Sequence, residues 1–244
     1  MTLTIFQLFH EGISVIYMAK KKRRSSVSGP SADSPNAFHI TSYEITSEPI
    51  QDQYYRRLPK HIKDAIERLH KESQSNPRKV IRELQELNEQ YPRVPQFYNY
   101  LAVAYSGIGE IGKAEAITLA NMRENPDYLF ARLNYAEFCL IRKDFAKIPE
   151  IFDHKFDLQL LYPKRKRFHV SEVANFMGLI GLYFYETDER ELAAQYNDIL
   201  QEIAPDYPMA KRLKRKLSPN LFVRLWKRLF DKSGGKASYR GKQD

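Results

Sequence analysis

Chemistry at a protein site usually depends on histidine, cysteine or acidic side chains, and in this chain these residues are scattered. The histidines lie at positions 10, 39, 61, 70, 154 and 169, without metal-ligand spacing to one another or to Cys139. No glycine-rich phosphate loop, HExxH motif or GxSxG motif occurs. His154 beside Asp153 and His169 near Ser171 resemble acid–base pairs, but capping or surface roles are the favoured interpretation. We therefore expect no catalytic residue, no bound metal and no cofactor.

Positive charge is concentrated at the C-terminal end. The whole chain carries a net charge of +9, yet residues 51–208 hold 22 Lys or Arg and 24 Asp or Glu. Residues 209–244 hold 12 Lys or Arg and only two Asp. An evenly basic protein would suggest nucleic acid or an anionic membrane as its partner. Here any such role is expected from the C-terminal segment alone.

That segment contains a predicted basic amphipathic helix, Leu221–Phe230, which follows a capping Ser218–Pro219 pair. Its leucine, phenylalanine and tryptophan side chains share one face. One interpretation is that this face folds back on the rest of the protein. The alternative is that the helix docks on an anionic membrane surface or in a partner's groove through Arg224, Trp226, Lys227 and Arg228. Nucleic-acid binding is less favoured, because no recognition motif accompanies the basic residues.

Proline spacing indicates the elements that would position binding residues. Pro92 and Pro126 lie 34 residues apart, Pro205 lies a further 79 along, and each follows a segment of helical character. Apolar side chains in these segments recur every three or four residues, as on one face of a helix. A period near 34 residues, with one helix pair in each unit, is typical of a helical solenoid. Such folds bind other molecules more often than they catalyse.

Turn residues support the same helix boundaries. Asn76–Pro77 predicts a helix that starts with proline at its first position. Asp188 with Glu191 three residues later predicts a capping box at the start of another helix.

Two stretches place bulky, small and turn residues in a common frame. The first stretch, residues 95–128, has Tyr98, Leu101, Ala102, Tyr105, Gly109, Ala114 and Pro126 at these positions. The second stretch has Met177, Ile180, Gly181, Phe184, Asp188, Ala193, Leu200 and Pro205. Both resemble the tetratricopeptide repeat (TPR). The small residues would let the paired helices approach closely: Ala102, Ala114, Gly181 and Ala193.

Two further units match the TPR frame less well. Residues 61–92 match only in their second half, and residues 129–162 have Ile148–Pro149 where a good helix former is expected. A proline there should shorten the second helix of its unit. The resemblance therefore implies an all-α, TPR-like helical-hairpin solenoid of two good and two degenerate repeats, over about residues 59–207.

In the TPR family the first helix of each pair lines a concave groove that holds a peptide or a helix of another protein. The resemblance implies these groove residues: Gln96, Asn99, Val103, Ser106, Phe130, Leu133, Asn134, Glu137, Asn175 and Tyr185, with Leu140 and Leu182 in line with them. Amide, aromatic and apolar side chains together suit an extended peptide or a helix. Some family members capture a C-terminal carboxylate with lysine, arginine and asparagine, and only Asn134 of that set is present. We therefore expect no carboxylate clamp.

The segment 153–173 is too apolar for a solvated loop. It contains Phe156, Leu158, Leu160, Leu161 and Tyr162, which a basic run at 164–167 follows. One interpretation is that these side chains fill the space left where Pro149 shortens a helix. The other is that they form a docking surface. The basic run is expected to be a solvated face.

Composition predicts one domain with two tails. Residues 1–50 are expected to be a disordered N-terminal segment, with Met18 as a possible true start. Within it, residues 38–45 have extended-strand character; one short strand builds no sheet, so this segment is expected to lie against the helical domain. The helical domain is expected over residues 51–207, basic capping and amphipathic helices over 208–232, and a disordered tail over 233–244. The stripe Met209, Leu213 and Leu217 resembles the helix that caps a TPR stack.

Two classes of function remain open. The first is a non-catalytic protein-binding module, an adaptor or chaperone-like scaffold that holds a peptide or helix in its groove. The alternative is a peripheral membrane or nucleic-acid-associated protein that acts through its basic C-terminal helix. Cys139 is the only cysteine and favours a reducing compartment, so a cytoplasmic location is expected, at the inner face of a membrane under the alternative.

Overall fold

The computed structural model describes residues 43–50 and 53–218 of the 244-residue chain. These residues form eleven helices and two short strands: β1 Glu44–Thr46, α2 Gln53–Arg57, α3 Lys60–Ser75, α4 Pro77–Gln90, α5 Pro95–Gly107, α6 Ile111–Glu124, α7 Leu129–Arg142, α8 Lys147–Ile151, α9 Leu158–Leu161, β2 Arg167–His169, α10 Val170–Glu186, α11 Arg190–Ile203 and α12 Pro208–Leu217. The described part is mostly helical, as the sequence predicts. The predicted helix at Leu221–Phe230, with Arg224, Trp226, Lys227 and Arg228, lies outside the described residues, as does Met18.

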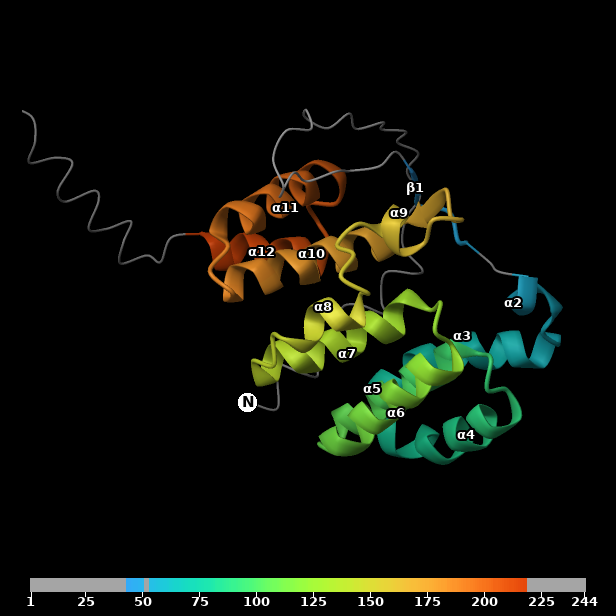
Figure 1. Ribbon diagram of the computed structural model, residues 1–244. Coiled ribbons are helices and arrows are strands. Elements are labelled where there is room, and N and C mark those ends of the chain that lie inside the picture. The colour runs from blue at the N-terminus through green and yellow to red at the C-terminus, as the bar shows by residue number, and fades with distance from the viewer. Residues whose placement is uncertain (1–42, 51–52, 219–244) are drawn as a thin grey trace, which may run out of the picture.

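Consecutive helices pack as pairs. α3 packs against α4, α5 against α6, α7 against α8, and α10 against α11. Each pair also contacts the next, because α5 packs on α3 and α4, α7 packs on α6, and α10 packs on α7. α12 packs on α10 and α11 at the end of the series (Figure 1). The prediction of sequentially packed helix pairs is therefore confirmed.

Two clusters of buried apolar side chains form the core. One lies among α2 to α6 and includes the fully buried Leu84 and Phe97. The other lies among α7 to α12, where the rings of Phe152 and Phe176 meet edge to face with centroids 5.4 Å apart. Phe138 of α7 belongs to the first cluster, although most buried residues of α7 belong to the second. α7 therefore joins the two halves of the core.

Prolines mark the helix boundaries. Pro92, Pro126 and Pro205 lie in the loops that follow α4, α6 and α11, as predicted. Pro77 is the first residue of α4, where its missing N–H leaves no helical hydrogen bond unmade. Pro149 lies within α8, which has only five residues, so the predicted shortening is confirmed.

The capping box predicted at Asp188 is wrong, and one occurs elsewhere. Asp188 has a positive φ of 67°, and its Oδ1 accepts from the Arg190 side chain at 3.0 Å instead of from the backbone of α11. At the start of α10, the His169 Nδ1 accepts from the Ser171 N–H at 3.2 Å, and Glu172 Oε2 accepts from the His169 N–H at 3.0 Å. The capping or surface role that the sequence favours for His169 is therefore confirmed as a capping role.

The apolar segment after α8 belongs largely to the core. Leu158, Leu161 and Tyr162 are buried in the second cluster, as the space-filling interpretation predicts. Asp157 caps α9 by accepting from the N–H groups of Gln159 and Leu160. The Leu160 side chain points out of the core and is 53% exposed.

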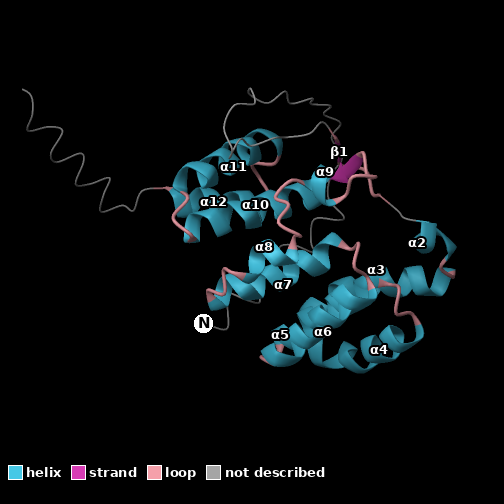
Figure 2. Cartoon of the chain, viewed as in Figure 1, coloured by secondary structure: helices cyan, strands magenta, loops and turns pink. Residues whose placement is uncertain are grey.

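A small parallel sheet ties the N-terminal end of the described chain to the α9–α10 connection. β1 pairs with β2 in the register Glu44 to Arg167 and Thr46 to His169. Figure 2 shows β1 in magenta near α9. Arg167 also forms ion pairs with Glu44 at 3.4 Å and with Glu48 at 3.5 Å. The expectation that this strand would build no sheet is therefore wrong, because its partner lies more than 100 residues away in sequence. Its expected position against the helical domain is confirmed, since β1 contacts α10. Part of the basic run at 164–167 is accordingly paired and not simply solvated.

Two glycines of α10 allow α12 to lie against it. A Cβ on Gly178 would lie 2.7 Å from the Cβ of Met209, and a Cβ on Gly181 would overlap a methyl of Leu213. Both separations are shorter than carbon atoms tolerate. A Cβ on Gly181 would also lie 3.1 Å from the Cβ of Tyr196 on α11, so the predicted requirement for a small residue between these paired helices is confirmed, and Gly178 meets a similar requirement against α12.

Candidate functional site

The predicted groove residues lie on three helices, α5, α7 and α10. Five of the ten are buried: Asn99, Val103, Ser106, Leu133 and Glu137. The other five are partly exposed: Gln96, Phe130, Asn134, Asn175 and Tyr185. A partner can therefore reach only the second set without a movement of the helices.

The burial on α5 has a simple cause. Ten of its 13 residues are buried, because α3, α4 and α6 all pack against it. On α7, Asn134 adds a hydrogen bond to Asn99 of α5. Periodicity within one helix predicts which face is apolar, but it does not reveal how many neighbours surround that helix.

Amide side chains join α5, α6 and α7 in a hydrogen-bond network. The Nδ2 of Asn121, on α6, donates to the Pro95 carbonyl at 3.1 Å and to Asn99 Oδ1 at 3.0 Å. The Nδ2 of Asn134, on α7, donates to the same Asn99 oxygen at 3.2 Å. Asn99 in turn donates to the Tyr128 hydroxyl at 3.1 Å. Two predicted groove residues, Asn99 and Asn134, therefore hold neighbouring helices together.

Loss of the central amide should weaken this junction. Asn121→Ala is expected to lower the free energy of unfolding by about 2 kcal/mol, because it leaves the Pro95 carbonyl without this donor and removes a bond to Asn99. Urea denaturation followed by circular dichroism measures the change. Asn175→Ala is the matched control, since among the described residues that amide bonds only the Ser171 carbonyl of its own helix, and its loss should change stability by about 0.5 kcal/mol or less. Equal effects of the two substitutions would contradict a stabilising network.

The C-terminal end of the predicted groove involves α12. Arg212 Nη1 lies 2.7 Å from Glu137 Oε1, and both side chains are largely buried, with 18% and 11% exposed. This ion pair crosses from α12 to α7. A predicted groove residue, Glu137, is therefore already bonded within the chain.

Tyr185 is also engaged by cations. The Arg190 guanidinium lies 3.8 Å from the centre of its ring, and the Lys216 ammonium lies 5.5 Å from it. Lys216 also pairs with Glu186 at 2.8 Å. Cations over a tyrosine face are attracted by the negative charge density of the ring. Arg190 and Lys216 thus connect Tyr185 of α10 to both α11 and α12.

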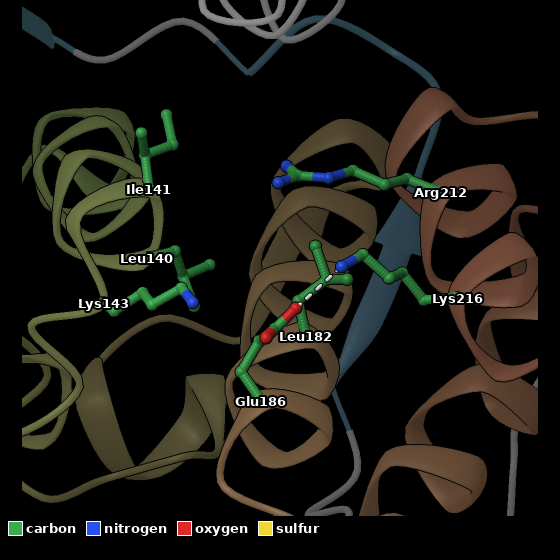
Figure 3. Close-up of a pocket in the computed structure, with 7 residues that line it drawn as sticks. All are labelled: Leu140, Ile141, Lys143, Leu182, Glu186, Arg212 and Lys216. Atoms are coloured by element: carbon green, nitrogen blue, oxygen red, sulfur yellow. Dashed lines mark hydrogen bonds and ion pairs between the residues drawn. The ribbon is translucent and has the colours of Figure 1, made fainter. Parts of the chain in front are cut away.

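A hollow of about 320 Å³ lies between α7, α10 and α12. The residues that line it are Leu140, Ile141, Lys143, Leu182, Glu186, Arg212 and Lys216. Figure 3 shows the α7 residues on one side, the α12 cations on the other and the α10 residues between them. Leu140 and Leu182, which the TPR resemblance places in the groove, are brought together here from two different helices.

The lining of the hollow is apolar at its base and cationic at its edges. Leu182 is 2% exposed and Leu140 is 8% exposed, whereas Ile141 is 39% exposed. Three of the lining residues are cations, and Glu186 is the one acid. The accessible lining is thus more polar than apolar, with the apolar side chains at its base.

Cys139 and His169, two residues whose side chains could take part in catalysis, have shifted pKa values. Cys139 lies on α7 one turn before Lys143, and burial raises the pKa of its thiol to about 11, with a smaller contribution from Asp144. The thiol is therefore protonated at neutral pH and a weak nucleophile. Burial lowers the pKa of His169, whose ring caps α10. Neither residue belongs to the lining of the hollow.

The cations of the hollow could not be identified from the repeat frame. Arg212 and Lys216 lie on α12, which the sequence identifies only as a capping helix. Their spacing of four residues, on one side of the Met209–Leu213–Leu217 stripe, was the available signal. Lys143 follows α7 with a left-handed φ of 61°, and no sequence pattern indicated where its side chain would lie.

No set of three or more His, Cys, Asp or Glu residues that could hold a metal occurs within residues 43–50 and 53–218. Over the same residues, every helix is too short or too polar to cross a membrane. Comparisons with protein-family models, curated proteins and solved structures find no match to this chain.

Proposed function

We propose that this chain is a TPR-like protein-binding module that holds a peptide or helix of another protein along α5, α7 and α10. The observation that carries the proposal is the hollow at the end of this line of helices. Its base is formed by Leu140 and Leu182, two residues at groove positions of the repeat frame. The series of packed helix pairs supports the proposal, because stacked pairs present their first helices along one surface.

The partly exposed groove residues are the contacts that we assign to the partner. Phe130 and Tyr185 supply aromatic surface, which contributes strongly to protein interfaces. Gln96, Asn134 and Asn175 supply amides that can meet the backbone polar groups of a bound segment. The buried members of the predicted set, such as Val103 and Leu133, would then shape the surface from beneath. We place this activity in the cytoplasm, in keeping with the single buried cysteine.

The test is affinity capture from a lysate of the source cells with the purified full chain as bait. A variant with Phe130→Ser and Tyr185→Ser should retain the captured partner about tenfold less well, because two aromatic contacts are lost. Tyr54→Ser is the matched control, since Tyr54 is an exposed aromatic on α2, outside the predicted groove. Circular dichroism should show that all the variants are folded.

The alternative function predicts a different result. A variant in which Arg224, Lys227 and Arg228 are all replaced by glutamate should lose every partner if the basic C-terminal helix is responsible. Capture would then fall steeply as salt is raised, because phosphate and anionic lipid contacts are screened. Capture that survives moderate salt and the tail substitutions, but not the two aromatic substitutions, would support the groove.

A further inference from the structure

We propose that the hollow between α7, α10 and α12 binds an acidic segment of a partner protein, which inserts an apolar side chain beside Ile141. This inference rests on the proposed function and specifies both the contact point and the chemistry of the partner. Three observations support it: the exposed apolar side chain at the edge of the hollow, the residual positive charge of the hollow, and the positive charge of the chain's own C-terminal segment.

One apolar side chain at the edge of the hollow, that of Ile141, is left exposed, whereas Leu140 and Leu182 at its base are already buried. Ile141 is one of four large apolar side chains that remain exposed on the described surface, and it lies at the edge of the hollow above Leu140 and Leu182. The volume of about 320 Å³ is at the small end of the range for ligand pockets. A space of this size suits one or two inserted side chains of a peptide. Leucine, isoleucine, methionine or phenylalanine would remove the exposed Ile141 side chain from water.

The charge of the hollow favours an acidic residue next to the inserted apolar side chain. Glu137 compensates Arg212, and Glu186 compensates Lys216. Lys143 makes no ion pair with the residues that the structure describes, although it lines the same hollow. One positive charge therefore remains uncompensated beside the apolar base. A carboxylate next to the inserted side chain would pair with it.

The charge of the chain's own C-terminal segment disfavours that segment as the occupant. Residues 219–244 carry seven Lys or Arg and two Asp. A segment of this composition would bring more positive charge to Lys143, Arg212 and Lys216. The charges therefore favour a segment of a separate protein, with acidic and apolar residues, as the occupant of the hollow.

A random peptide library displayed on phage, selected against the full chain, tests this inference. Selected peptides are expected to combine Asp or Glu with leucine, isoleucine, methionine or phenylalanine. Fluorescence anisotropy with one such synthetic peptide then measures affinity for variants. Ile141→Ser should weaken binding about tenfold, because the inserted apolar side chain of the peptide loses its contact with Ile141. Lys143→Asn should weaken it about two- to fivefold, since an exposed ion pair contributes little.

Matched controls lie elsewhere on the surface. Leu160→Ser removes a comparably exposed apolar side chain on α9, and Lys155→Asn removes an exposed cation, and neither should change affinity. Asparagine tolerates the left-handed backbone of residue 143, so Lys143→Asn should not disturb the fold.

The outcomes separate this inference from the proposed function. Peptides that bind but are insensitive to Ile141 and Lys143, or that are basic, would overturn the hollow as the site while leaving a groove on α5 and α7 in place. A selection that enriches no peptide would overturn both. Acidic peptides whose binding is lost in Ile141→Ser and kept in Leu160→Ser would support both.

Discussion

Replacing Leu161 with aspartate is expected to lower the free energy of unfolding by about 4 kcal/mol or more, which would unfold many domains of this size. Leu161 is 8% exposed and belongs to the cluster among α7 to α12. Loss of its buried surface removes about 1.5–3 kcal/mol. The new carboxylate would add the free energy of placing a charge, or a newly protonated acid, in an apolar environment. Urea denaturation followed by circular dichroism measures the total.

The neighbouring residue supplies the control. Leu160→Asp places the same side chain on the same short helix, at a position that is 53% exposed. We expect it to change stability by about 0.5 kcal/mol or less. If the two substitutions proved equally mild, α9 would not be packed on the core, and the docking-surface interpretation of residues 153–173 would return. If both unfolded the protein, the exposed position of Leu160 would be contradicted.

The helical part of the fold was predictable because its signals are local. Pro92, Pro126 and Pro205 mark the ends of α4, α6 and α11, and Pro149 marks the short α8. Each proline acts through its own backbone, so no knowledge of tertiary contacts is needed. The pairing of β1 with β2 depends on contacts between segments that are distant in sequence. That pairing could not be predicted from either strand alone, since a three-residue strand carries almost no pattern.

The candidate site was only partly predictable for a related reason. Leu140 and Leu182 could be assigned from the repeat frame, because their positions on α7 and α10 follow from helical periodicity. The cations that surround them come from α12 and from the end of α7. The ion pairs that these cations form, such as that of Arg212 with Glu137, depend on how the helices pack. The sequence therefore assigned Leu140 and Leu182 to groove positions, but it did not indicate the hollow or the balance of charge around it.

Removal of Arg212 is expected to have the second-largest effect. Arg212→Ala should lower the free energy of unfolding by about 3 kcal/mol, because it leaves the Glu137 carboxylate largely buried without its cation. A loss of about 3 kcal/mol lies at the lower end of the range for breaking a buried ion pair, since both side chains keep some contact with water. Urea denaturation measures the loss, and limited proteolysis should show earlier cleavage within α12. Arg215→Ala, at an exposed position of the same helix, should change stability by about 0.5 kcal/mol or less.

A double-mutant cycle separates the ion pair from the packing of the arginine stem. Glu137→Gln removes the charge that Arg212→Ala would leave unpaired, so the double variant should be at least about 1 kcal/mol more stable than the sum of the single effects predicts. Strict additivity would mean that Arg212 stabilises α12 only by its contacts with neighbours such as Met209. Coupling of the expected sign would show that one ion pair fixes α12 against α7. The hollow would then depend on that pair for the position of its cationic wall, because Arg212 and Lys216 both lie on α12.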